Sequence, residues 1–396
     1  GDNTSGQLGL GDMSIRKASK HVEVPLPSKC TPEYVVCGQQ QTAVVTGSGR
    51  VFFCGFSYST FVPVASLERM TMPEGLLLEL SLGPSAVIAL VQPSKRDTTE
   101  VYTWGSCDHG QLGHGQAQQR LPQPTFVESF FDESIQHVVC GETHMAAVSL
   151  SGEVWCWGDN LEGYLGVSDA GLGSGDMDAS SAIVSKPARV RGALTGKTVT
   201  QVVCGVHFTV AVTENGRVYS WGRGAYGQLG HGDSENVLFP KKIGSIARKF
   251  HIEALATGGK HTIALSDTGQ LLSWGTGRAL RLGTETSNDV MVPTPIEHLT
   301  NKIAFDVACG ASFTLTTITT MKVTVCYQGN KQSVTSEVCP QIFDVLKMVC
   351  TYWKLQRPGD FELVTPEGVP LTGFEETRKV LAQGTTFLWL GQQHQP

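Results

Sequence analysis

The sequence predicts an all-β protein: a β-propeller over residues 1–318, followed by a small α+β domain over 321–391 and a tail over 392–396. Three observations carry this prediction. A phrase of the form Trp-Gly, four residues, Gly-x-Leu-Gly recurs along the chain. An apolar run that ends in Cys-Gly recurs in step with it. The pattern then changes after residue 320, and fixed-period self-similarity of this kind is typical of a repeat architecture.

The Trp-Gly phrase sets the length of the repeating unit. Its glycines, or their equivalents, stand at intervals of 54, 50, 53, 64 and 53 residues: Gly1, Gly55, Gly105, Gly158, Gly222 and Gly275. The tryptophans recur with the units, so we interpret them and the glycines that follow as structural positions rather than as a binding platform. These positions are Trp104, Trp157, Trp221 and Trp274, with Gly105, Gly158, Gly222 and Gly275.

Each unit reads as a series of short strands. The unit around Cys140 has an apolar strand that ends at the anchor, a second strand over 145–150, a turn at Ser151-Gly152 and a third strand over 154–157. A residue followed by Gly between two apolar runs is a strong hairpin signal. The anchor strand is apolar on both faces, which favours an inner place near a propeller axis. Units of about 50 residues with about four strands predict propeller blades, with a stacked-strand solenoid as the alternative.

Six Cys-Gly anchors or equivalents are present, at Cys37, Leu82, Cys140, Cys204, Thr257 and Cys309. The phrases from Trp221 to Gly232 and from Cys140 to Ala147 resemble the regulator of chromosome condensation repeat family, and the resemblance covers residues 1–318. It implies a seven-bladed propeller, so a blade or part of one is expected upstream; a six-bladed or incompletely closed ring is the alternative. It also implies protein partners, among them small GTPases of the Ran, Rho or Ras kind.

The segment after residue 320 has a different pattern. Strands are predicted over 321–326, 333–338, 361–364 and 385–390, with a helix over 341–355 whose apolar residues share one face. This order resembles a ubiquitin-like β-grasp domain such as the Ras-binding-like domain of engulfment and cell motility adaptors. The resemblance implies protein recognition through an edge strand, with Lys322 and Lys331 as candidate contacts. The strand ending at Cys326 would also fit the third position of the sixth blade.

Composition narrows the function classes. The net charge of −6 and the pI near 6.0 disfavour a general attraction to nucleic acid or acidic membranes. Most of the 11 cysteines stand in apolar runs and none forms a C-x-x-C pair, which predicts reduced thiols and an intracellular, cytoplasmic or nuclear protein. No apolar stretch is long enough for a membrane span, and no signal peptide precedes the first repeat.

The sequence offers no catalytic or cofactor motif. It contains neither a phosphate-binding loop nor a nucleophile elbow. His144 and His261 follow their anchors at one repeated position, but that position also accepts Gln, Ala and Phe, so packing or hydrogen bonding explains it better than metal ligation. His114 and His231 are predicted as exposed turn residues. We therefore expect no enzyme, no metal and no cofactor.

The candidate partner contacts within the predicted propeller are acidic. Asp108 and Asp159 stand in turns of neighbouring units and could crowd one rim of the ring, although aspartate also suits tight turns by itself. Asp176 and Asp178 stand in a Gly/Ser-rich insertion over 168–181, which could be a tolerated insertion or a partner-contacting loop. The predicted function is a protein-interaction module that regulates or scaffolds a small GTPase, with guanine-nucleotide exchange as one form. The alternative is a substrate-recruiting part of a larger ubiquitin ligase or signalling scaffold, and chromatin binding is disfavoured by the acidic balance.

Overall fold

The computed structural model describes most of the repeat region and four strands after it. The described residues are 2–16, 23–26, 30–57, 60, 62–115, 120–167, 183–246, 249–299, 302–319, 322–327, 330–335, 361–364 and 387–392, the last four ranges by their backbone alone. The predicted helix over 341–355 and the acidic insertion with Asp176 and Asp178 lie outside them.

Five antiparallel sheets of four strands follow one another along the chain. We number them blades 1 to 5. Blades 1 and 2 comprise β1 Pro32–Cys37, β2 Gln41–Thr46, β3 Val51–Phe56 and β4 Pro63–Arg69, then β5 Leu76–Leu82, β6 Ala86–Gln92, β7 Glu100–Gly105 and β8 Leu121–Phe126. Blade 3 comprises β9 Ile135–Cys140, β10 His144–Ser149, β11 Val154–Asp159 and β12 Ile183–Arg189. Blades 4 and 5 comprise β13 Val199–Cys204, β14 Phe208–Thr213, β15 Val218–Gly222 and β16 Val237–Lys242, then β17 Ile252–Thr257, β18 His261–Ser266, β19 Leu271–Gly275 and β20 Val290–Pro295.

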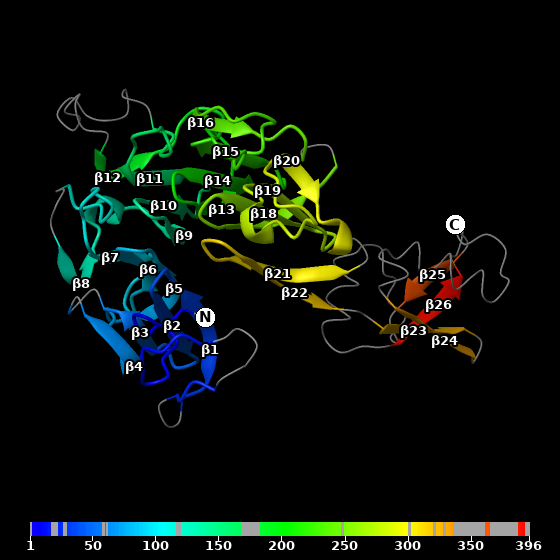
Figure 1. Cartoon of the computed structure of the whole chain (residues 1–396), viewed down its shortest axis with the longest axis horizontal. Coiled ribbons are helices and arrows are strands. Elements are labelled where there is room, and N and C mark those ends of the chain that lie inside the picture. Colours follow the sequence, from blue (N-terminus) through cyan, green and yellow to red (C-terminus); the bar gives the residue numbers. More distant parts are fainter. Residues whose placement is uncertain are drawn as a thin grey trace.

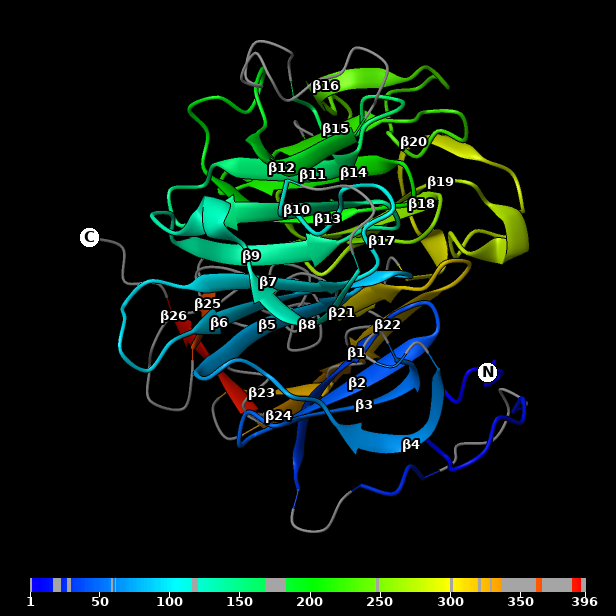
Figure 2. The same cartoon turned by 90° about the vertical axis from the view of Figure 1, so that its left-hand side faces the viewer.

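A sixth sheet follows with two described strands, β21 Ile303–Cys309 and β22 Thr314–Thr319. The sequence predicts six blades, and the structure shows five complete blades and this pair. Figure 1 shows the sheets arranged around an arc, from blade 1 at the lower left, over the top, to β21 and β22 near the centre of the picture. Figure 2 shows the same blades stacked one against the next. The described residues therefore form a β-propeller with one partial blade.

The first strand of each blade lies innermost. Strands β1, β5, β9, β13, β17 and β21 contact one another in sequence around the arc. The Cys-Gly anchors that end these strands line a common pocket at the axis. This arrangement confirms the expected inner place of the anchor strand, because a strand covered on both faces can be apolar throughout.

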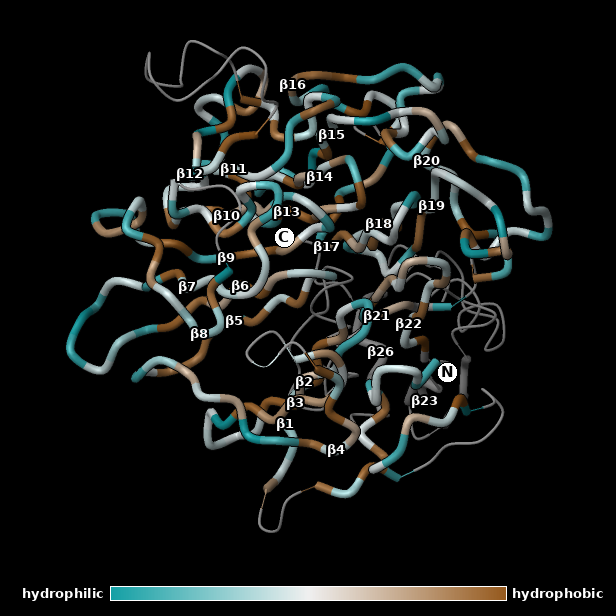
Figure 3. Tube along the Cα trace, turned by 60° about the vertical axis from the view of Figure 1, so that its left-hand side comes forward, coloured by the Kyte–Doolittle hydropathy of each residue, from teal (hydrophilic) through white to brown (hydrophobic). Residues whose placement is uncertain are grey.

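The apolar cores lie between successive blades. One cluster joins Ile88 and Leu90 of blade 2 to Met145 and Trp157 of blade 3, and all four side chains are fully buried. In Figure 3 the apolar colour follows the strands and the hydrophilic colour marks many of the outer loops. Each blade is therefore stabilised by burial of apolar area against its neighbour.

A further sheet has the strand order β24-β23-β26-β25, from β23 Lys322–Tyr327, β24 Asn330–Thr335, β25 Phe361–Val364 and β26 Phe387–Gln392. Strand β23 runs antiparallel to β24 and parallel to β26. The strand that could have served as the third strand of blade 6 therefore pairs within this sheet. The assignment of the segment to a ubiquitin-like β-grasp domain, and its boundaries, stay predictions.

Candidate partner-binding rim

The loops on one side of the ring are fixed by a repeated turn. Gly158 lies near the end of β11 with a φ of +114°, and a Cβ there would lie 2.5 Å from the carbonyl oxygen of Thr143. The next amide, that of Asp159, donates to the same oxygen at 3.0 Å. Equivalent bonds repeat in the other complete blades. The loop after each anchor and the loop after each Trp-Gly thus lie side by side. We call this side the loop rim, residues 83–85, 105–115, 141–143, 158–167, 205–207, 222–236, 258–260 and 275–289.

The Gly-x-Leu-Gly part of each loop packs against the next blade. The indole Nε1 of Trp157 donates to the carbonyl of Gln111 at 2.8 Å, and that of Trp274 donates to the carbonyl of Gln228 at 2.9 Å. The leucines of these phrases are almost completely buried: Leu112, Leu165, Leu229 and Leu282. We call this phrase the plug. Because the plug is anchored, it holds the preceding loop residues at the rim.

The predicted candidates Asp108 and Asp159 lie on neighbouring loops of the rim. Asp159 accepts the amide of Leu161 at 3.0 Å, and its side chain is 16% exposed. Burial and a hydrogen bond to Asp159 raise the pKa of the Tyr164 hydroxyl. Asp108 is exposed and accepts the hydroxyl of Ser106 at 2.7 Å. Asp159 is therefore mainly occupied within its own turn, whereas Asp108 is free to face a partner.

His109 brings the two loops together. Its Nδ1 lies 3.9 Å from the carboxylate of Asp159, and its side chain is 45% exposed. The contact crosses from blade 2 to blade 3.

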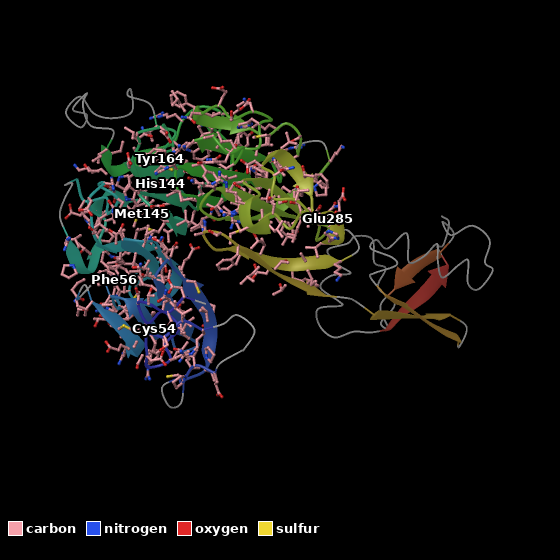
Figure 4. The ribbon with its side chains drawn as sticks, in the orientation of Figure 1. Cys54, Phe56, His144, Met145, Tyr164 and Glu285 are labelled. Atoms are coloured by element: carbon pink, nitrogen blue, oxygen red, sulfur yellow. The ribbon has the colours of Figure 1, made fainter. Side chains whose placement is uncertain are left out.

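Aromatic rings of blades 3 and 4 contact one another where the two blades meet at the rim. The rings of Tyr164 and His207 stack with centroids 5.5 Å apart, and the ring centroid of His144 lies 5.2 Å from that of Tyr164. Burial, with the nearby His207, lowers the pKa of His144 to about 3, so His144 is neutral at physiological pH. Its Nε2 pairs with the hydroxyl of Thr209 at 2.9 Å. Figure 4 shows His144 and Tyr164 close together.

The charge of the rim changes along the ring from acidic to mixed. The loops of blades 2 and 3 present Asp108, Glu142, Asp159 and Glu162. The loops of blades 4 and 5 present cations and carboxylates together: Arg223, Lys260, Arg278 and Arg281 with Asp233, Glu235, Glu285 and Asp289. The two regions meet where Arg223 Nε lies 3.6 Å from Glu162. An acidic arc beside an arc of mixed charge would orient a partner of complementary charge.

Two exposed leucines stand within this charged surface. Leu161 is 75% exposed, in an acidic loop, and Leu280 is 55% exposed, in a loop of mixed charge. Leu280 has a φ of +56°, a left-handed conformation that glycine occupies at the same place in other repeats, as Gly163 does at +75°. Strained positions of this kind cluster at functional sites. Sequence reasoning missed both leucines, although a Leu where the repeat carries Gly was a visible signal.

Lys322 and Lys331 are not on the rim. They lie on β23 and β24, in the sheet that follows the propeller, and Lys331 pairs in register with Cys326. Strand β24 is an edge of that sheet in the described residues. The structure therefore does not join the two lysines with the acidic candidates.

The prediction that His114 and His231 are exposed turn residues was wrong. His114 Nε2 pairs with the hydroxyl of Thr103 at 3.0 Å, and His231 Nε2 pairs with that of Ser220 at 3.0 Å. Both rings are partly buried, and burial lowers the pKa of each. They hold the end of the plug against the third strand of their own blade.

The described residues contain little that could support covalent chemistry. No group of three or more His, Cys, Asp and Glu side chains among them is placed to hold a metal ion. Burial raises the pKa of the Cys54 thiol to about 11 and those of Cys140 and Cys309 to about 12, so these thiols stay protonated and weakly nucleophilic at neutral pH. Among the described residues, no helix is both long and apolar enough to cross a membrane.

Comparison with known proteins identifies what this geometry resembles. The family model of the RCC1-like domain matches residues 1–334. The human E3 ubiquitin-protein ligase HERC2 is 28% identical over 366 residues, which cover 80% of this chain and 7% of HERC2. The Arabidopsis thaliana ultraviolet-B receptor UVR8 is 35% identical over 249 residues, 63% of this chain and 52% of the receptor. The chain thus spans about half of this plant receptor and a small part of HERC2.

Solved structures show the same fold. Yeast RCC1 (Prp20), in its complex with Kap60, superposes with a TM-score of 0.66 at 20% identity, over 80% of this chain and 74% of that protein. Human WBSCR16 superposes with a TM-score of 0.65 at 24% identity, over 79% of each chain. A separate structure of Prp20p from Saccharomyces cerevisiae, described with its binding to Gsp1p and histones, gives 0.62 at 19% identity, over 82% of this chain and 72% of that protein.

Proposed function

Because the chain belongs to the RCC1-like domain family, we propose that it is a protein-interaction module that regulates or scaffolds a small GTPase through its loop rim. The observation that carries the proposal is the rim itself. It places an acidic arc, which holds the exposed Leu161, next to an arc of mixed charge, which holds the exposed Leu280. Apolar anchors within a charged border are typical of protein interfaces.

Regulation of a GTPase by exchange would need no catalytic residue. Displacement of a bound nucleotide makes and breaks no covalent bond, so contacts that compete with phosphate or its Mg²⁺ are sufficient. Asp176 and Asp178 have the chemistry for this, because carboxylates bind Mg²⁺ and repel phosphate. Asp108, an exposed carboxylate on the rim loop of blade 2, has the same chemistry. The yeast Prp20p structure, which is described with its binding to Gsp1p, supports this choice of partner only through the shared fold.

A nucleotide-release assay tests the proposal. Ran-, Rho- and Ras-family GTPases loaded with a fluorescent GDP analogue would be mixed with the wild-type chain, with Leu161→Asp and with a deletion of 169–181. Leu150→Asp is the matched control, since Leu150 is 64% exposed at the hairpin of β10 and β11, away from the rim. We expect faster release with wild type and the control, and at least a tenfold loss with Leu161→Asp. Unchanged release rates and no measurable complex with any of the three families would reject the proposal.

A second candidate is a substrate-recruiting part of a larger ubiquitin ligase or scaffold. The match to HERC2 favours it, because an RCC1-like segment covering 80% of this chain also occurs within that ligase. A full-length transcript that encodes a ligase domain in the same chain would favour this candidate. Ubiquitination of proteins that bind wild type but not Leu161→Asp would then be the functional test.

Chromatin binding is the weakest of the three candidates. The net charge of −6 gives no general attraction to DNA. The cations of the loops of blades 4 and 5, among them Arg223, could still contact nucleosomes. A cytoplasmic or nuclear location suits all three candidates. Tight nucleosome binding at physiological salt, lost on Arg223→Glu, would overturn the preference for a GTPase.

A further inference from the structure

A cavity of about 310 Å³ lies at the joint between blades 3 and 4, on the side of the ring away from the loop rim. Two segments form its described wall, the hairpin of β10 and β11 over 151–154 and the connection from β12 to β13 over 189–198. Both segments are described without a gap. The loop rim begins near the other end of β11, at residue 158, so the cavity belongs to a different surface of the propeller.

Three cations line this cavity: Arg189, Arg191 and Lys197. The same positions can be compared at four joints, because each connection repeats two main-chain hydrogen bonds. Here the amide of Val190 donates to the third strand of blade 3, and the amide of Lys197 donates to the carbonyl of Leu194. The corresponding residues of the other three joints are Phe126, Glu128 and Glu133, then Lys242, Gly244 and Lys249, then Pro295, Glu297 and Lys302. Of these four joints, only the one between blades 3 and 4 carries three cations.

The charge of Arg189 is already balanced. Its guanidinium lies 2.6 Å from the carboxylate of Glu133 and 3.2 Å from that of Glu153, and its Cζ lies 4.7 Å from the ring centroid of Trp155. Glu153 is also the one carboxylate that lines the cavity in its described wall. Arg189 therefore forms a fixed edge of the cavity rather than a free cation.

Arg191 and Lys197 are the cations that remain for a ligand. Both are exposed, and neither forms an ion pair with a described residue. One further carboxylate is near, because the amide of Glu214 donates to the carbonyl of Thr198 at 3.0 Å, and the Glu214 side chain is exposed. The cavity thus offers two cations to an anion.

The connection that carries these two cations differs from those of the other joints. Leu194 follows Val190 by four positions, whereas the corresponding spacing is three at the other joints compared. Gly192 and Gly196 have φ values of +85° and +72°, left-handed conformations that suit glycine. These turns bring both ends of the connection, with Arg191 and Lys197, to one cavity.

Hydroxyl-bearing and apolar residues complete the wall. The first kind are Ser151, Thr195 and Thr198, and the second kind are Val154, Val190 and Leu194. Hydroxyl groups can donate to an anionic oxygen, and apolar side chains favour contact with carbon. The volume of about 310 Å³ is far larger than the roughly 30 Å³ that one water molecule occupies. The cavity therefore suits a ligand that combines an anionic group with a carbon part.

We propose that this cavity binds the phosphate group of a phosphoserine or phosphothreonine in a partner protein. Arg191 and Lys197 would donate charge-assisted hydrogen bonds to the phosphate oxygens, and the hydroxyls of Thr195 and Thr198 would add to them. The carbon atoms that carry the phosphate would lie against the apolar part of the wall. Arginine-containing pockets are a recurring means of recognising phosphorylated side chains. The site is independent of the proposed function of the loop rim, because the two surfaces lie at opposite ends of the strands.

The test uses a blocked amino acid, N-acetyl-phosphothreonine N-methylamide, with the full chain. Broadening of its ³¹P signal would report binding. The glutamate and unphosphorylated threonine compounds with the same blocking groups, and inorganic phosphate, would compete against it. We expect saturable binding of the phosphothreonine compound, and at least tenfold weaker binding of all three competitors.

The competitors also define how the proposal fails. No saturable broadening at millimolar concentrations would overturn it. Equal affinity for inorganic phosphate would show a site for the free anion and would overturn the assignment to a partner protein. Equal affinity for the glutamate compound would show a site for acidic peptides and would overturn the assignment to phosphate.

Variants of the chain test the two cations. Arg191→Gln and Lys197→Gln should each weaken binding about tenfold, because each removes a charge-assisted hydrogen bond. Lys241→Gln is the matched control, since Lys241 is exposed on β16 and is not part of the described wall, and its affinity should equal that of wild type. Lys197→Glu places here the residue type of Glu133 at the preceding joint and should abolish binding. All these residues are exposed, so circular dichroism should show an unchanged fold. Wild-type affinity in both Arg191→Gln and Lys197→Gln would reject the site.

Discussion

The indole of Trp157 donates to the main-chain carbonyl of Gln111 across 2.8 Å, and this bond joins blade 2 to blade 3. Both partners are almost fully buried. The bond explains why tryptophan, rather than another large apolar residue, suits this position in Trp157 and, through the equivalent bond, in Trp274. It supplies apolar area and a donor for the plug carbonyl at once.

Trp157→Phe should therefore cost more stability than Trp221→Phe. Both side chains are fully buried, but the Nε1 of Trp221 has no hydrogen-bond partner among the described residues. The difference between the two variants should be about 1 kcal/mol, the net value of one buried hydrogen bond. Urea unfolding followed by circular dichroism measures it, and equal losses would mean that the bond to Gln111 adds nothing.

His144 should make the fold sensitive to acid. Burial lowers its pKa to about 3 from the usual 6.5, so folding keeps the ring neutral. Its contribution is complete above pH 6.5 and is lost as pH falls, because the unfolded chain takes up the proton first. His144→Gln places at this position the residue that the chain itself uses at Gln41. Between pH 7.5 and 5, wild type should lose about 1 to 2 kcal/mol more stability than the variant. Parallel pH profiles would contradict this.

His137 should act in the opposite direction. Its Nδ1 lies 2.8 Å from Glu79 and its Nε2 lies 2.7 Å from the carbonyl of Val202, so it bridges blades 2, 3 and 4. Burial acts to lower its pKa, but the hydrogen bond and charge of Glu79 outweigh burial and raise it. The stabilisation is then complete below pH 6.5 and is lost as pH rises through the raised value. Glu79→Gln should flatten the stability profile between pH 6.5 and 8.5. A profile with the wild-type slope would show that Glu79 does not hold the proton.

The repeat could be predicted from sequence because each blade uses the same few residues for the same contacts. The hairpin between Cys140 and Trp157 could be located from the sequence, because the turn residues Ser151 and Gly152 separate its two apolar strands. His144 could be assigned to packing or hydrogen bonding because Gln, Ala and Phe replace it in other units. Comparison between the repeated units therefore predicted most of the fold.

The site was less predictable, because it depends on how loops of different blades meet. Asp159 reads as an exposed acid, yet it is held by the amide of Leu161 within its own turn. His114 reads as a turn residue, yet it folds back onto Thr103. Both contacts depend on side-chain direction within a loop, and periodicity in the sequence does not report that direction.

Gly158→Ala should damage the fold strongly. The added Cβ would lie 2.5 Å from the carbonyl oxygen of Thr143, and the φ of +114° is unfavourable for alanine. We expect a loss of about 3 kcal/mol in the free energy of unfolding. Gly47→Ala is the control, because nothing lies within 4 Å of its Cβ position, and it should be neutral or stabilise by up to about 1 kcal/mol. Similar effects at both glycines would show that the close approach at Gly158 can relax.

Leu280→Gly should raise the stability of the fold and weaken binding of a partner. Leu280 has a φ of +56° and is 55% exposed, so glycine would relieve the backbone and lose little buried area. The variant should gain about 1 kcal/mol in the free energy of unfolding, because a left-handed residue is strained by roughly that amount. If the loop rim binds a partner, the same variant should lose affinity, because it removes an apolar anchor. Leu150→Gly serves as the control, since it removes an equally exposed leucine at the hairpin of β10 and β11. It should bring no such gain in stability and leave binding unchanged. A more stable Leu280→Gly chain with full partner affinity would show that the strain at Leu280 has another cause than binding at the rim.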